Sequence, residues 1–120
     1  MLINELFIDK EKYNAMPIQR RMLYDIIAFE ANYIFADTII DILVKRNPNY
    51  YDDTNDLFQI RSFQADRDTA WECKYRFTRL FESEYGELSA EVKEEIKTVA
   101  REFANIPLVK FGWIKETAND

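Results

Sequence analysis

The sequence predicts a mostly α-helical fold: three main helices, two of them long, packed as a small bundle with short extended or two-stranded termini. Only two glycines and three prolines interrupt the 120 residues, so long stretches lack the residues that break helices. Along these stretches apolar residues recur at alternating steps of four and three, the spacing of one helix face. Apolar residues make up 48% of the chain and charged residues 32%, a balance typical of a globular protein. We therefore expect one helical domain over residues 1–120.

The first long helix is predicted from about Pro17 to Arg46. Proline suits a first helical turn, the basic residues of the last turn suit the negative end of the helix dipole, and Asn47-Pro48 ends the pattern. The apolar residues that form and widen its inward face are Met22, Leu23, Ile26, Ile27, Phe29, Tyr33, Ile34, Ala36, Ile40 and Leu43. A face this wide predicts a central helix rather than one lying on the surface.

The second long helix is predicted from about Asn55 to Tyr85, after a polar turn. Asp53 or Thr54 can cap its start, and Gly86 suits its end. The residues expected to point inward are Leu57, Ile60, Phe63, Ala70, Phe77 and Leu80. Because this stripe weakens over residues 64–68, we expect a kink or a second cap there.

A third helix is predicted from Ala90 to about Asn105, with Ser89 as its cap and a break before Pro107. Its inward stripe is Val92, Ile96, Val99, Phe103 and Ile106. The two ends of the chain, Leu2–Ile8 and Leu108–Ile114, are short and apolar. Since residues alternate in the second of these, a two-stranded ribbon and an extended tail packed on the bundle both fit the pattern.

The composition excludes several classes of site. The chain has no histidine, so it lacks an imidazole base near neutral pH and cannot form a Ser-His-Asp or Cys-His arrangement. Its one cysteine, Cys73, cannot form an internal disulfide or a Cys-rich metal site, and its phase predicts a buried thiol. The two glycines lie too far apart for a phosphate-binding loop. We therefore expect no cofactor.

Charge and hydropathy bear on location and partners. The net charge of −6 argues against binding to nucleic acid or to an anionic membrane, because both need a positive surface. The start of the chain lacks the basic residues and long apolar run of a signal peptide, and no stretch is apolar enough to span a bilayer. With a single cysteine, these features predict a cytoplasmic protein.

The acidic residues offer one route to catalysis, since carboxylates alone can hold Mg²⁺. Asp37 and Asp41 are four residues apart, and Glu91, Glu94 and Glu95 have similar spacing on the third helix. Paired acids of this kind would fit a magnesium-dependent nucleotide hydrolase. The alternative reading is a solvated face, because the first pair flanks an apolar stripe and the second group is interleaved with lysines.

Aromatic and arginine residues offer a route to recognition, because Trp, Tyr and Arg are enriched at interface hot spots. Two adjacent tyrosines fall in the polar turn, where exposed aromatics favour contact with a partner. Others fall on the second helix, where they either form a recognition face or cover the first helix. The residues expected to contact a partner are Tyr50, Tyr51, Arg67, Trp71, Tyr75 and Arg79.

In length, charge, aromatic content and lack of histidine, and in the run WECKYRF over residues 71–77, the chain resembles small anti-defence proteins that bacteriophages encode. Among these it is similar to the inhibitor of a defence-associated sirtuin, a large host enzyme that degrades NAD. The resemblance implies a non-catalytic protein that acts in the host cytoplasm by binding and inhibiting this larger protein, which prevents NAD depletion. A self-assembling helical regulatory protein is a further alternative, since the stripe of the first helix is long enough for self-association.

Overall fold

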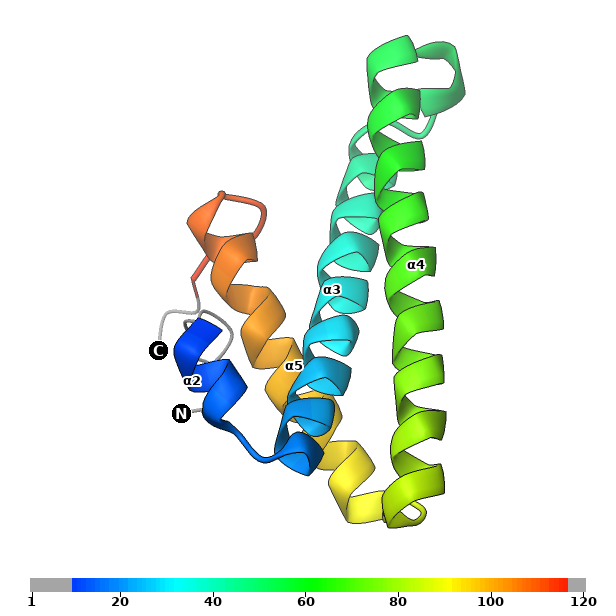
Figure 1. The fold of residues 1–120 in the computed structure, drawn as a ribbon. Coiled ribbons are helices and arrows are strands. Elements are labelled where there is room, and N and C mark those ends of the chain that lie inside the picture. Colours follow the sequence, from blue (N-terminus) through cyan, green and yellow to red (C-terminus); the bar gives the residue numbers. More distant parts are fainter. Residues whose placement is uncertain (1–9, 117–120) are drawn as a thin grey trace.

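The computed structural model describes residues 10–116, which form four α-helices and one short 3-10 helix (Figure 1). In chain order they are α2 (Lys10–Ala15), α3 (Ile18–Arg46), η1 (Tyr50–Asp52), α4 (Thr54–Tyr85) and α5 (Ala90–Lys110). The predicted class, a mostly α-helical fold with three main helices of which two are long, is confirmed. None of the helices in this part of the chain combines the length and the apolar character needed to cross a bilayer.

Helix α3 is the centre of the arrangement (Figure 1). It forms an antiparallel hairpin with α4 on one side and packs against α5 on the other, whereas α4 and α5 barely touch each other. The wide apolar face of α3 explains this position, because one neighbouring helix would leave part of that face in water. The prediction of a central first helix is therefore confirmed.

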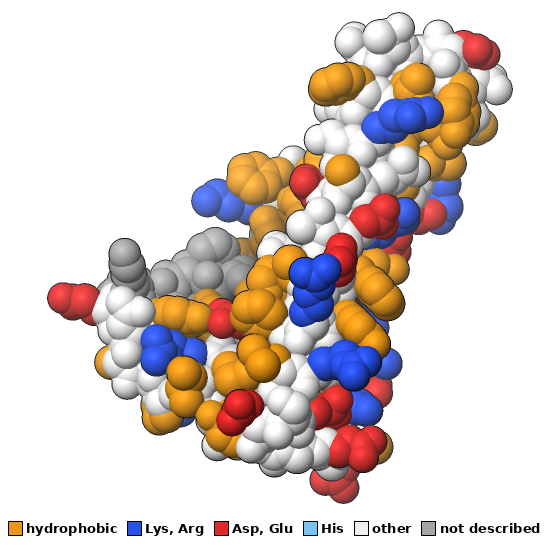
Figure 2. All heavy atoms as spheres, turned by 45° about the vertical axis from the view of Figure 1, so that its right-hand side comes forward, with side chains coloured by type: hydrophobic (Ala, Val, Ile, Leu, Met, Phe, Trp, Pro, Cys, Tyr) orange, Lys and Arg blue, Asp and Glu red, His pale blue; other side chains and the backbone are white. Residues whose placement is uncertain are grey.

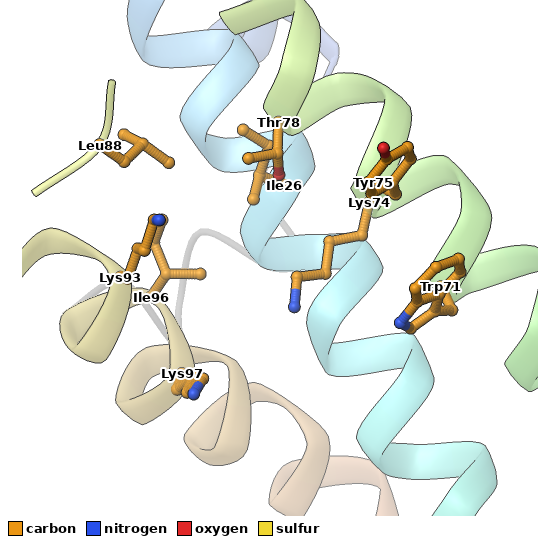
Figure 3. Close-up of a pocket in the computed structure, with 9 residues that line it drawn as sticks. All are labelled: Ile26, Trp71, Lys74, Tyr75, Thr78, Leu88, Lys93, Ile96 and Lys97. Carbon is orange, nitrogen blue, oxygen red and sulfur yellow. The ribbon is translucent and has the colours of Figure 1, made fainter. Parts of the chain in front are cut away.

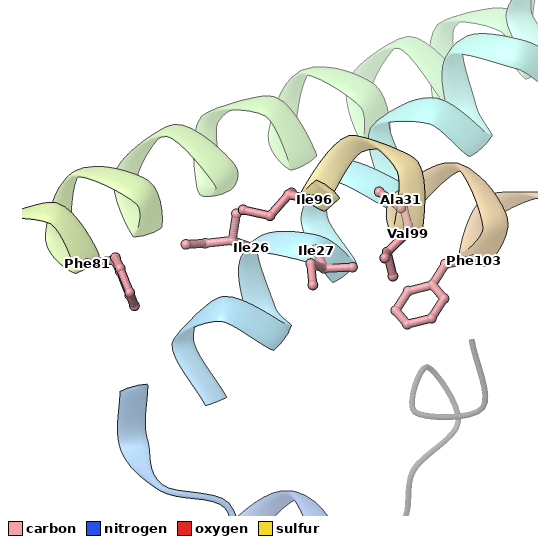
Figure 4. Close-up of a cluster of buried hydrophobic side chains, with 8 residues drawn as sticks. Ile26, Ile27, Ala31, Phe81, Ile96, Val99 and Phe103 are labelled. Atoms are coloured by element: carbon pink, nitrogen blue, oxygen red, sulfur yellow. The ribbon is translucent and has the colours of Figure 1, made fainter. Parts of the chain in front are cut away.

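The core lies in two clusters along α3. The first joins apolar residues of α3, α4 and α5, of which the largest fully buried side chains are Ile26 and Phe103 (Figure 4). The second surrounds Ile39 and Ile60 and includes Leu108 near the end of α5. Burial at both sites fixes α4 and α5 to the same central helix at two separate levels.

Both ends of α4 match the sequence prediction. The side chain of Asp53 accepts a hydrogen bond of 3.1 Å from the backbone N–H of Asp56, which caps the first turn. Gly86 ends the helix with φ at +96°, a conformation that side-chain-bearing residues rarely adopt. The expected kink or second cap at residues 64–68 is wrong, because α4 runs through this segment without interruption and without a bend (Figure 1). Beyond it Ala70 is buried, so the inward face resumes in phase.

The prediction that Leu80 of α4 points inward is wrong. Leu80 is 53% exposed, whereas the adjacent Phe81 is only 5% exposed and belongs to the first core cluster. Neighbouring residues on a helix point about 100° apart, and α4 buries only a narrow face, so one of these two side chains faces the core and the other faces solvent. The larger aromatic ring takes the buried position, four residues after the inward Phe77.

Helix α5 begins as predicted and ends later. The Ser89 hydroxyl accepts a hydrogen bond of 3.2 Å from the backbone N–H of Val92. The expected break before Pro107 is wrong, because the helix continues to Lys110. Leu108 is 1% exposed in the second core cluster, and its burial offsets the cost of a proline inside the helix.

The predicted strand pattern near the C-terminus is also wrong. Residues 108–110 complete α5, and residues 111–114 form a turn in which the Trp113 N–H donates to the Leu108 carbonyl at 2.8 Å. The alternation of apolar residues there reflects packing rather than a strand, because Trp113 and Ile114 fold back onto the second core cluster. The other half of the expected ribbon, Leu2–Ile8, lies outside the described residues.

A buried ion pair joins α3 to α4. Glu30 is 7% exposed, and its carboxylate accepts hydrogen bonds of 2.8 and 3.2 Å from the Lys74 ammonium. A carboxylate removed from water needs such a partner, because an unpaired buried charge is strongly destabilising. The pair therefore also fixes the register of the two long helices.

Replacing Lys74 by methionine is expected to lower the free energy of unfolding by about 3 kcal/mol, because the Glu30 carboxylate would stay buried without a partner. The matched control is Lys45→Met, which breaks the exposed pair with Asp41 and should cost less than about 1 kcal/mol. Urea unfolding followed by circular dichroism measures both variants. Equal stability of K74M and K45M would contradict the structural role of the buried pair.

Replacing Pro107 by alanine is expected to raise the free energy of unfolding by about 1–2 kcal/mol. The alanine N–H can bond to the carbonyl of Phe103, which the proline ring cannot do within the helix. Thermal unfolding of P107A against the natural chain tests this. A lower melting temperature in P107A would instead show that the half-buried proline ring supplies packing worth more than one hydrogen bond.

Candidate functional site

Three of the predicted contact residues form one connected row on α4, which we call the aromatic ladder: Trp71, Tyr75 and Arg79. Their spacing of four residues places them on one face of the helix. The rings of Trp71 and Tyr75 stack with centroids 5.6 Å apart and an angle of 6° between their planes. The Arg79 guanidinium lies 5.7 Å from the centre of the Tyr75 ring and donates a hydrogen bond of 2.9 Å to its hydroxyl.

The ladder faces solvent although it is apolar over much of its length. Trp71 is 53% exposed and Tyr75 47% exposed. The hydrogen bond to Tyr75 raises the pKa of Arg79 above its ordinary value, so the guanidinium keeps its charge at any physiological pH. Flat apolar faces next to a fixed cation are typical of residues that anchor protein interfaces.

Arg67, also on α4, has a different environment. It lies 3.2 Å from Asp37 of α3 and 3.4 Å from Asp68, and its side chain is 27% exposed. Burial lowers the pKa of Arg67. The hydrogen bonds to the carboxylates of Asp37 and Asp68 raise this pKa by more than burial lowers it, so the pKa lies above its ordinary value. Arg67 therefore joins α4 to α3 through its ion pair with Asp37.

The two tyrosines of the turn form a second group, far from the ladder. Tyr50 and Tyr51 lie in η1, where their rings stack with centroids 4.7 Å apart. Tyr51 is 66% exposed, whereas Tyr50 packs against the second core cluster, and its hydrogen bond with Tyr51 raises the pKa of Tyr50. About 25 Å of helix separates the start of α4 from Trp71, so the six predicted residues do not form one site.

A groove runs beside the ladder, between α4 and α5, and we call it the α4–α5 groove. It has a volume of about 300 Å³. Figure 3 shows Trp71 and Tyr75 of α4 on one wall, Lys93 and Lys97 of α5 on the other, and Ile26 of α3 between them. The groove exists because α4 and α5 pack on α3 but not on each other.

Sequence reasoning missed the lysine wall of this groove. Lys93 and Lys97 were interpreted as part of a solvated face because acidic residues adjoin them. The available signal was their spacing of four residues, which places both on one side of α5 next to the inward Ile96. The spacing alone does not indicate a groove, because the groove also depends on where α4 lies relative to α5.

Other apolar side chains are exposed on the same hairpin. The face in Figure 2 shows apolar, basic and acidic side chains interspersed along it rather than one region of a single sign. Phe58 of α4 is 77% exposed and lies outside the ladder. Cys73, expected to be buried, is a half-buried free thiol.

The acidic residues considered as metal ligands are engaged elsewhere or dispersed. Asp37 pairs with Arg67, and Asp41 pairs with Lys45 at 2.9 Å, so neither carboxylate of α3 is free for a cation. Among residues 10–116 no three acidic or cysteine side chains lie close enough together to hold a metal ion. Other acids of this part of the chain accept hydrogen bonds: Asp53 caps α4, and Asp25 accepts from the Tyr13 hydroxyl.

No protein-family model matches the chain, and no match was found among curated proteins or solved structures.

Proposed function

We propose that this chain is a non-catalytic protein that binds a larger protein through the aromatic ladder and inhibits it. The observation that carries the proposal is the ladder itself: two stacked, half-exposed aromatic rings continued by an arginine that is hydrogen-bonded to one of them. Exposed Trp and Tyr side chains lose water over a large apolar area when they are covered, so they are favoured anchors in protein interfaces.

The resemblance to phage anti-defence proteins suggests a first partner. A defence-associated sirtuin consumes NAD, and a small protein that sequesters it would stop that consumption without chemistry of its own.

The double variant Trp71→Ala/Tyr75→Ala is expected to weaken partner binding at least 30-fold, on the order of 2 kcal/mol, because it removes both aromatic anchors. The matched control is Phe58→Ala, which removes an exposed aromatic ring from the same helix outside the ladder. Tagged chains are used to capture partners from a bacterial lysate, and recovered proteins are identified by mass spectrometry. A partner that binds all three chains equally would contradict the role of the ladder.

Inhibition is tested with a purified defence-associated sirtuin. Because the proposed inhibitor acts by forming a complex, NAD consumption is expected to fall in proportion to added chain and to stop near an equimolar ratio. The W71A/Y75A chain should leave NAD consumption unchanged at that ratio. Undiminished NAD consumption in a molar excess of the natural chain would exclude this enzyme as the target.

A further inference from the structure

The α4–α5 groove has an unusual charge for this chain. Acidic residues outnumber basic ones 22 to 16 in the sequence, yet three of the described side chains that line the groove are lysines and none is acidic. Lys74 is neutralised by Glu30 beneath it. Lys93 and Lys97 form no ion pair within residues 10–116, so the groove presents two unpaired cations on its α5 wall.

Most of the remaining side chains that line the groove are apolar. Opposite the lysines lie the exposed rings of Trp71 and Tyr75, and Leu88 lies near the end where α4 and α5 are joined (Figure 3). Thr78 adds a hydroxyl oxygen that is buried without a hydrogen-bond partner in the described structure. An apolar wall facing a cationic wall fits a ligand that is itself apolar on one side and acidic on the other.

We propose that the α4–α5 groove receives an acidic amphipathic helix of the partner protein, with apolar side chains against Trp71 and Tyr75 and carboxylates against Lys93 and Lys97. This inference rests on the proposed function and specifies the chemistry of its partner. A helix lying along the rim of the groove would contact both α4 and α5, and burying the apolar face of a helix in a groove is a recurring mode of recognition. Strand addition is not favoured, because residues 10–116 contain no sheet edge to extend.

The volume of the groove sets how the helix is held. About 300 Å³ accommodates roughly two large side chains rather than a whole helix. The helix therefore lies along the rim and inserts apolar residues spaced three or four apart. Its carboxylates stay near the rim, where the attraction to the lysines is partly screened by salt.

The test is selection of binders from a displayed library of random peptides of about 20 residues, long enough for a helix of the length of this face. We expect selected peptides to carry apolar residues at helical spacing together with an excess of Asp and Glu. The strongest binder is then synthesised, and its affinity is measured by calorimetry for the natural chain and for Lys93→Glu/Lys97→Glu. We expect the K93E/K97E chain to bind the peptide at least tenfold more weakly than the natural chain, because two attractive charge pairs at the rim become repulsive. Peptide binding to the natural chain is expected to weaken at higher salt.

The control is Arg61→Glu/Lys115→Glu, which changes the net charge equally at exposed positions outside the groove and should bind the peptide nearly as well as the natural chain. Circular dichroism verifies that both variants are folded. Peptides without acidic enrichment, failure to select any binder, or equal affinity for K93E/K97E and the control would overturn the proposal. A natural chain that sediments as a dimer and becomes monomeric in K93E/K97E would also overturn it, because a second copy would then occupy the groove.

The two proposals fail separately. If a partner needs Trp71 and Tyr75 but binds K93E/K97E as well as the natural chain, the ladder is supported as the contact surface. The proposal that the groove binds an acidic helix is then excluded. If a partner binds W71A/Y75A as well as it binds the natural chain, the ladder is excluded as the contact surface. This holds whether or not K93E/K97E binds the partner.

Discussion

The burial of α3 by two different helices is the constraint on which the rest of the structure depends. One amphipathic partner cannot cover so wide an apolar surface, so α4 and α5 each take part of it. Both flanking helices are fixed to α3 rather than to one another. The groove between them is thus a direct result of how the core is built, and the ladder stands at its edge because Trp71 and Tyr75 lie just outside the buried face of α4.

Polar interactions reinforce the same arrangement. The pairs Glu30–Lys74 and Asp37–Arg67 both join α3 to α4, one buried and one more exposed. These pairs engage four charged residues, among them Asp37, which was considered as a metal ligand, and Arg67, which was expected to contact a partner. Charge in this chain is therefore divided between groups that maintain the hairpin and groups, such as Lys93 and Lys97, that have no internal partner among residues 10–116.

Periodicity was sufficient to predict most of the fold from the sequence. The long stripe of α3, the cap at Asp53, the stop at Gly86 and the cap at Ser89 all follow from local chemistry that does not depend on distant residues. The errors arose where tertiary packing decides: Phe81 rather than Leu80 faces the core, and burial of Leu108 carries α5 past its proline. The ladder was predictable in part, because its spacing lies within one helix. The groove was not, because it depends on two helices meeting a third without meeting each other.

The internal contacts of the ladder have a thermodynamic consequence for any complex it forms. Each ring is already held by its neighbour, and Arg79 is held by both a hydrogen bond and the face of Tyr75. Long side chains that are free in solution lose rotamer entropy when a partner immobilises them, at about 0.5–1.5 kcal/mol for each. Here much of that loss has already occurred on folding, so more of the energy gained by covering the rings would be expressed as affinity.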